Sequence, residues 1–283
     1  MRNRRGYTLV ELLIVMIIMV TVTGGMLRLL NTSQRLSRAQ AERVDLQSNV
    51  RIGSIVVPAE LREINTYAGS VDPFRTDILN KTATSINYRA MRGIGFVCAG
   101  STTTQLRLSS FSGVRASQAV RDAAYVFSEG ANPDTGNDDS WLPVSITGVA
   151  TSNTCGNGTV ELTVAPALAA APPVGTPVRT YEQMQLSLYQ LDGKSWLGVR
   201  SLSGGDLTPR PLLGPLKDVD GLNLAYLAAN GAAPATNADV KSIVLTIRGV
   251  TSEQVSSGGG NAHAAYVQDS LVSQVSLRNA FRP

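Results

Sequence analysis

Histidine and cysteine are almost absent from this sequence. Its 283 residues include one histidine, His263, and two cysteines, Cys98 and Cys155. A nucleophilic active site needs a histidine or a substitute base beside its nucleophile. His263 lies near three glycines in a predicted loop, which indicates a solvated position. No phosphate-binding glycine loop, dinucleotide-binding fingerprint, HExxH or CxxC motif occurs. We therefore expect a protein that is not an enzyme and that uses no cofactor.

The two cysteines lack the spacing of a metal site, and one histidine cannot complete a ligand set with them. In an exported domain we expect Cys98 and Cys155 to form one disulfide. Such a bond would close a loop of roughly 60 residues and contribute about 4 kcal/mol in the chain-entropy model. Two buried free thiols are the alternative, because a sequence does not place two Cα atoms within bridging distance.

Acidic residues cluster once, in the segment PDTGNDD, at Asp134, Asp138 and Asp139. Their oxygens suit a hard cation such as calcium, but the spacing misses the pattern of an EF-hand loop. We favour a solvated turn and expect no metal, with these three residues as weak candidates.

The sequence has little excess of either charge. Its net charge is +4, and Arg2, Arg4 and Arg5 supply three of these positive charges directly before an apolar run. This arrangement is typical of a membrane-orienting signal. The later arginines occur singly, without a basic stripe or interleaved aromatic residues, so we expect no dedicated nucleic-acid site.

Charge is scarcest between residues 7 and 30, where the only charged residues are Glu11 and Arg28. As a helix, these roughly 24 positions would extend about 36 Å, enough to cross a hydrocarbon core of about 30 Å. Glu11 should cost a few kcal/mol on insertion, so it is a functional candidate. Two alternatives are an interfacial charge that reaches the lipid headgroups and a cleaved secretory signal ending near Gly24.

An amphipathic pattern follows without an intervening loop, which predicts one helix from about residue 7 to about residue 64. An ordinary separate helix packed on a soluble domain is the alternative. Pro58 lies inside the pattern, so we expect a kink or local break there. The apolar positions follow three- and four-residue steps, with Arg43 filling one slot: Leu36, Ala39, Leu46, Val50, Gly53, Val57, Leu61 and Ile64.

Beyond residue 65 the pattern changes to strands and loops. Residues 184–202 form a predicted hairpin, in which Asp192 and Gly193 supply a tight turn. Alternation predicts further strands in 85–91, 104–110, 159–164, 242–250 and 270–279. Segments rich in Gly, Pro, Asn and Ser predict loops at 128–140, 165–177, 228–239 and 256–264. The fold class is therefore α+β, with a long N-terminal helix packed on an antiparallel, β-rich globular domain.

The segment RRGYTLVELLIVMII resembles the type III signal of type IV prepilins and pseudopilins. The resemblance implies cleavage after Gly6 by a prepilin peptidase, N-methylation of Tyr7 as the new N-terminus, and a pilin-like fold. It also implies that Glu11 pairs with an N-terminal amine during assembly. A cut after Gly6 would place the ammonium of Tyr7 one helical turn before Glu11, where opposite charges meet. Arg28 stands where major pilins commonly carry a proline.

Weaker resemblance points to the W-type minor pilins and the J-type minor pseudopilins. It lies in the helix segment 46–64 and in the C-terminal segments 216–231, 240–251 and 275–283. The resemblance implies a minor pilin that is incorporated at or near the filament tip and helps to start assembly. A J-type pseudopilin of a type II secretion system is the alternative, and a signal-anchored exported enzyme or binding protein is a distant one.

This interpretation divides the chain into four parts. Residues 1–6 are the leader, 7–30 the half of the helix that lies in the membrane and then in the filament core, 31–64 its amphipathic half, and 65–283 the globular domain. The implied location is the inner membrane, with a periplasmic globular domain, followed by the extracellular filament. The implied partners are the prepilin peptidase, membrane lipid, the inner-membrane assembly platform, and other minor and major pilins.

Overall fold

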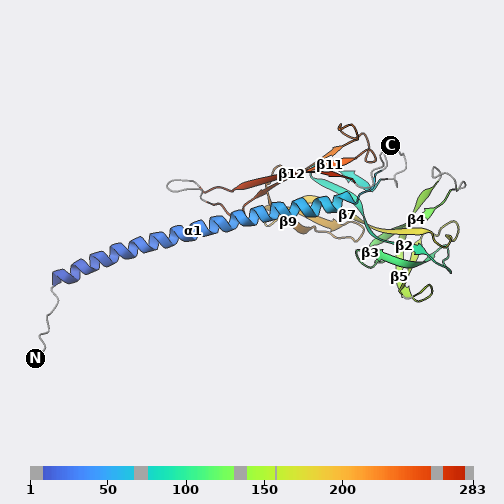
Figure 1. The fold of residues 1–283 in the computed structure, drawn as a ribbon, viewed down its shortest axis with the longest axis horizontal. Helices are drawn as coiled ribbons and strands as arrows, with labels where there is room; N and C mark the ends of the chain where they lie inside the picture. The colour runs from blue at the N-terminus through green and yellow to red at the C-terminus, as the bar shows by residue number, and fades with distance from the viewer. Residues whose placement is uncertain (1–8, 67–75, 131–138, 157, 256–263, 278–283) are drawn as a thin grey trace, which may run out of the picture. The chain divides into compact units, whose positions relative to one another are not determined.

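A computed structural model describes residues 9–66, 76–130, 139–156, 158–255 and 264–277 of the chain. It contains one long helix, α1 (Leu9–Arg62), followed by antiparallel strands (Figure 1). The predicted α+β class is confirmed. The strands are β1 (Ile78–Lys81), β2 (Ser85–Val97), β3 (Gln105–Gly113), β4 (Asp122–Ser128), β5 (Ser140–Ser152), β6 (Thr159–Ala165), β7 (Pro177–Leu191), β8 (Lys194–Ser201), β9 (Arg210–Leu216), β10 (Leu222–Leu227), β11 (Ser242–Val250) and β12 (Gln268–Ser276).

Helix α1 covers almost the whole predicted range. The predicted core positions from Ala39 onward are buried, but Leu36 is 58% exposed, so its inclusion in the buried stripe was wrong. Every residue from 9 to 38 is exposed, so the buried stripe begins at Ala39. The helix also continues through Pro58 without the expected break. Pro58 removes the backbone hydrogen bond to the Ser54 carbonyl, but Val57 and Leu61 on either side of it remain buried in the core and hold this turn of the helix.

The chain forms two compact units. The first consists of Met1–Ser48 and Val250–Asp269. Within it, the carboxylate of Glu42 accepts hydrogen bonds from the backbone N–H groups of Ser252, at 2.7 Å, and Glu253, at 3.3 Å. Val255 and Ala265 form an isolated antiparallel bridge. The Glu42 side chain thus attaches the residues after β11, Ser252 and Glu253, to the helix.

The second unit, Asn49–Gly249 and Ser270–Pro283, contains a closed β-barrel. Strands pair in the order β2-β3-β6-β5-β4-β7, and β7 pairs with β2 again, which closes a ring of six strands. Closure removes the unpaired edges that an open sheet would leave. The barrel interior is filled by Val97, Leu106, Leu108, Ala124, Val126, Val144, Ile146, Leu162, Val164 and Val178.

A second core lies between the end of α1 and the remaining sheet. Val57, Leu61 and Ile64 pack against side chains from β1, β2 and the strands β7 to β12. The approach is close at Gly53, where a Cβ would lie 2.5 Å from Cδ2 of Leu213 and 2.9 Å from Cδ1 of Ile247. The long strands β2 and β7 contribute to both cores, so no linker separates the barrel from the helix-covered sheet (Figure 1).

The predicted β7–β8 hairpin is confirmed, with Leu191 opposite Lys194. Asp192 and Gly193 have positive φ values of 51° and 72°, as a type I′ turn requires. Strands β1, β4, β5, β9 and β10 were not predicted. Proline interrupts the alternation in β5 (Pro143) and in β9 (Pro211 and Pro215), and the apolar run of β4 does not alternate. Most of the predicted loop 256–264 lies outside the described residues.

Candidate functional site

The first site candidate is the exposed apolar part of α1. Every residue from 9 to 38 is exposed, and large aliphatic side chains dominate the segment as far as Leu30. The helix is long and apolar enough to cross a membrane. A contiguous apolar surface of this size marks a site that contacts lipid or protein.

Glu11 lies in the first turn of α1 and is exposed. The partial positive charge of a helix N-terminus favours a carboxylate at this position. Polar side chains further along are bonded within the helix. The hydroxyls of Thr21 and Thr32 donate to the carbonyls of Ile18 and Arg28, each at 2.8 Å. Such bonds suit a helix in lipid, where water cannot satisfy these groups. The other predicted processing residues, Gly6 and Tyr7, lie outside the described residues.

A disulfide joins Cys98, which follows β2, to Cys155, which lies between β5 and β6. The Cα atoms are 6.2 Å apart, and the sequence separation is 57 residues. The predicted pairing is therefore present, and the alternative of two free thiols is wrong. The bond connects two loops of the barrel.

The predicted acidic cluster is described in part. Asp139 accepts a hydrogen bond from the backbone N–H of Gly130 at 3.1 Å, while Asp134 and Asp138 lie outside the described residues, as does His263. Within the described part of the chain, no three His, Cys, Asp or Glu side chains come together as a metal site would require.

A group of partly buried arginines surrounds Glu182, and the sequence alone did not predict it. We call this group the Glu182 cluster. Glu182 is on β7 and is 2% exposed. Its carboxylate accepts hydrogen bonds from Arg92 at 2.9 Å, Arg115 at 3.0 Å and Arg121 at 2.5 Å. Arg115 also forms a two-bond pair with the buried Asp122, at 2.8 and 2.5 Å. These residues are far apart in sequence and carry no local pattern, so only the strand pairing reveals them.

Opposing effects set the pKa of Glu182. Burial alone would raise the pKa of this carboxyl, but hydrogen bonds from Ser201, Arg115, Arg121 and Arg92 outweigh burial and lower it to about 2. Glu182 therefore remains ionised at neutral pH. A carboxylate bonded to three arginines has a structural role, because its oxygens are already occupied.

Asp77 shows the opposite behaviour. Burial raises its pKa to about 6, against the opposing effects of the Asn65 N–H and the charges of Arg89 and Arg179. Its Oδ2 accepts a hydrogen bond from that N–H at 2.9 Å. Asp77 thus attaches the residues after α1 to the start of β1.

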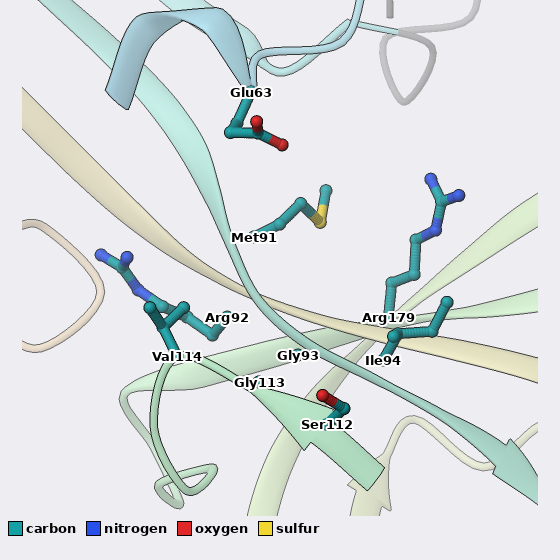
Figure 2. A pocket seen from close by; sticks show the side chains of 9 residues that line it. All are labelled: Glu63, Met91, Arg92, Gly93, Ile94, Ser112, Gly113, Val114 and Arg179. Carbon is teal, nitrogen blue, oxygen red and sulfur yellow. The ribbon is translucent and has the colours of Figure 1, made fainter. Parts of the chain in front are cut away.

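A pocket of about 330 Å³ lies beside the barrel, between the residue after α1 and strands β2, β3 and β7. Figure 2 shows Glu63, Met91 and Arg179 on its walls, with the Arg92 guanidinium pointing away from that of Arg179. The guanidinium carbon of Arg179 is 4.8 Å from the centre of the Trp141 ring. The lining includes one hydroxyl, of Ser112, and one carboxylate, of Glu63, and Figure 2 shows these two side chains far apart across the pocket.

Comparison with known proteins finds a known sequence motif at the N-terminus. The family model described as the prokaryotic N-terminal methylation motif matches residues 1–27. No curated protein and no solved structure matches the chain. The motif and the exposed apolar helix together support a type IV prepilin-like protein. Over residues 1–27 the chain is thus similar to proteins of the type IV pilin kind, which points to a structural protein.

Proposed function

We propose that this chain is a minor pilin of a type IV pilus, anchored in the inner membrane before assembly. The observation that carries the proposal is the methylation motif of residues 1–27, followed by an exposed apolar helix with Glu11 in its first turn. A prepilin peptidase removes residues 1–6 by cleavage after Gly6 and methylates the new N-terminus at Tyr7.

Glu11 acts during assembly. A carboxylate near the end of a spanning helix is unfavourable in lipid, but pairing with an N-terminal ammonium neutralises it. The ammonium belongs to the same helix or to a neighbouring pilin. Such pairing favours lateral association of helices and sets their axial register. Residues 7–30 span the membrane and then enter the filament core, and residues 31–64 connect them to the globular domain, 65–283.

The minor role and the position at or near the tip rest on the resemblance to W-type minor pilins. The large barrel supports a minor role, because a repeated shaft subunit must also pack against copies of itself. The subunit contacts other minor and major pilins through its helix and is delivered by the inner-membrane assembly platform. Its globular domain lies in the periplasm before export.

A J-type pseudopilin of a type II secretion system remains the second candidate, since the same leader serves both systems. The genes beside this one distinguish the two: genes of a secretion system would overturn the pilus assignment. The length and the Cys98–Cys155 disulfide favour the pilus.

N-terminal sequencing of the protein from membranes tests the proposal. We expect N-methyl-tyrosine followed by Thr-Leu-Val-Glu-Leu-Leu. In a Gly6→Ala variant the leader should remain attached, with the protein still in the membrane. Mature protein of normal size in that variant would show that the leader is not of type III.

A further inference from the structure

One outer surface of the barrel combines apolar side chains with a single cation. Strand register places Ile94, Arg179, Tyr125 and Pro143 in one row across β2, β7, β4 and β5. Two residues along, Phe96 is opposite Pro177, and Phe127 is opposite Trp141. Side chains two residues apart share a face of a strand. Tyr125 is only 4% exposed, so it is not counted as part of the surface. We define the outer barrel face as Ile94, Phe96, Phe127, Trp141, Pro143, Pro177 and Arg179.

The outer barrel face is accessible. Ile94 and Phe96 are 37% and 43% exposed, and Phe127, Trp141, Pro143 and Pro177 are half-buried. Phe127 and Trp141 are in edge contact, with ring centres 5.4 Å apart. Aromatic residues make up 5% of the sequence. With Phe96, Phe127 and Trp141, this face is enriched in them. Large aromatic side chains with arginine are typical of the residues that dominate protein–protein binding.

Arg179 lies within this face and supplies its charge. Its side chain is exposed and stacks near Trp141 at 4.8 Å. Among the residues that the structure describes, its guanidinium forms no ion pair. Arg92 differs, because it is bonded to Glu182. Beside Arg179 the 330 Å³ pocket opens, with Met91, Ile94 and Val114 on its walls (Figure 2). Glu63 and Arg92, of opposite charge, also line this pocket. A carboxylate at Arg179 would therefore have its apolar contacts with Ile94, opposite Arg179 on β2, and with Trp141.

Charge argues against two other occupants. A second copy of the chain, related by a two-fold axis through this face, would bring two Arg179 side chains together without an acidic residue of the face to separate them. A nucleic acid needs several cations along its phosphates, and this face offers one.

We propose that the outer barrel face is a docking surface for an acidic, apolar segment of another protein. A carboxylate of that segment binds Arg179, and its neighbouring apolar side chains cover Ile94 and Trp141. All residues of this face lie on barrel strands. The docking proposal can therefore fail while the proposed role as a pilin holds, and the reverse.

The test uses the full-length protein in a non-ionic detergent. Trp196→Phe leaves Trp141 as the single tryptophan, and its fluorescence reports the contact with Arg179. The probes are the capped pentapeptide Ala-Leu-Asp-Leu-Ala and its counterpart with Asn in place of Asp. We expect a saturable change with the Asp peptide and roughly tenfold weaker binding of the Asn peptide, since one charge-assisted hydrogen-bonded pair is removed.

Three variants complete the test. Arg179→Gln should abolish the preference for the Asp peptide, and Arg179→Lys should retain part of it through its charge. Arg210→Gln, at an arginine whose side chain is 73% exposed on β9, is the matched control and should bind as the parent does. Equal affinity for the two peptides, no saturable change, or a preference that persists in Arg179→Gln would overturn the proposal.

Discussion

The carboxylate of Glu182 lies 2.9 Å from Nε of Arg92, and this contact joins β7 to β2 where the two cores of the second unit meet. Arg115 and Arg121 approach the same carboxylate from the connection between β3 and β4. The cluster therefore attaches a barrel connection to the two strands that both cores share.

Replacing Glu182 by glutamine should destabilise the protein strongly, because three partly buried arginines would lose their common partner. Breaking a buried ion pair in this way costs roughly 3–5 kcal/mol. Denaturant unfolding followed by circular dichroism measures the loss. Asp220→Asn is the control: Asp220 is 64% exposed at its side chain and 4.0 Å from Arg248, so a change below about 1 kcal/mol is expected. Similar losses in both variants would contradict the role of the cluster.

Stability should depend on pH through Asp77. Its folded pKa of about 6 exceeds the ordinary value of 3.8, so the folded state binds this proton more tightly than the unfolded state. The resulting stability is complete below about pH 4 and is lost as pH rises through about 6. Asp77→Asn should remove this decline, which amounts to about 3 kcal/mol at most. Unfolding midpoints at pH 4 and pH 7 provide the measurement, and an unchanged difference between them in the variant would refute the assignment.

Glu182 should act in the opposite pH range. Its folded pKa of about 2 lies below the ordinary value of 4.5, so its stabilisation is present above about pH 4.5 and is lost as pH falls through about 2. In Glu182→Gln the acid-induced loss of stability should shrink. A full acid-induced loss in that variant would mean that other carboxyl groups account for it.

Gly53→Ala should destabilise the protein although alanine is the better helix former. The added methyl group would meet Leu213 and Ile247 at 2.5 and 2.9 Å. Overpacking of this kind costs about 1–3 kcal/mol, against a gain of about 1 kcal/mol in helix propensity. Gly24→Ala, in the same helix with nothing within 4 Å of the new methyl, should be neutral or stabilising. The midpoints of thermal unfolding compare the two variants. An unchanged midpoint in Gly53→Ala would show that the side chains of Leu213 and Ile247 move aside at little cost.

Reduction of the Cys98–Cys155 disulfide should destabilise the barrel. A loop closed over a separation of 57 residues corresponds to about 4 kcal/mol of chain entropy, with lower values common. The unfolding midpoint with and without a reducing agent measures the effect. The double variant Cys98→Ser/Cys155→Ser should match the reduced protein and should not respond to reductant.

Glu11→Leu should insert into the membrane at least as well as the parent, because an insertion penalty of a few kcal/mol disappears. Entry into filaments should fail, since no carboxylate remains to meet an N-terminal amine. The measurement is the amount of subunit that co-purifies with sheared filaments, relative to the amount in membranes. Co-purification at the parental level would exclude pairing at Glu11 as an assembly step.

Local sequence patterns predicted much of the fold. The periodicity of residues 36–64 predicted α1 and its buried side from Ala39 onward, and Asp192-Gly193 predicted the β7–β8 turn. Closure of the barrel was not predictable, because β2 ends at Val97 and its partner β7 begins only at Pro177, after four other strands. The Glu182 cluster depends on that pairing and was missed for the same reason. Leu36 was assigned to the buried stripe because periodicity shows which face of a helix is apolar. It does not show at which residue other parts of the protein cease to cover that face.

The sharing of β2 and β7 by both cores has a mechanical consequence. A tensile load passed from the helix-covered core to the barrel runs along these two antiparallel strands, which are held in register by eleven residue pairs from Ser85↔Ser187 to Phe96↔Pro177. Because each strand contributes side chains to both cores, the covalent backbones of β2 and β7 carry the load, and the ladder of hydrogen bonds keeps the two strands aligned. The barrel is thereby built to stay attached while the subunit is pulled.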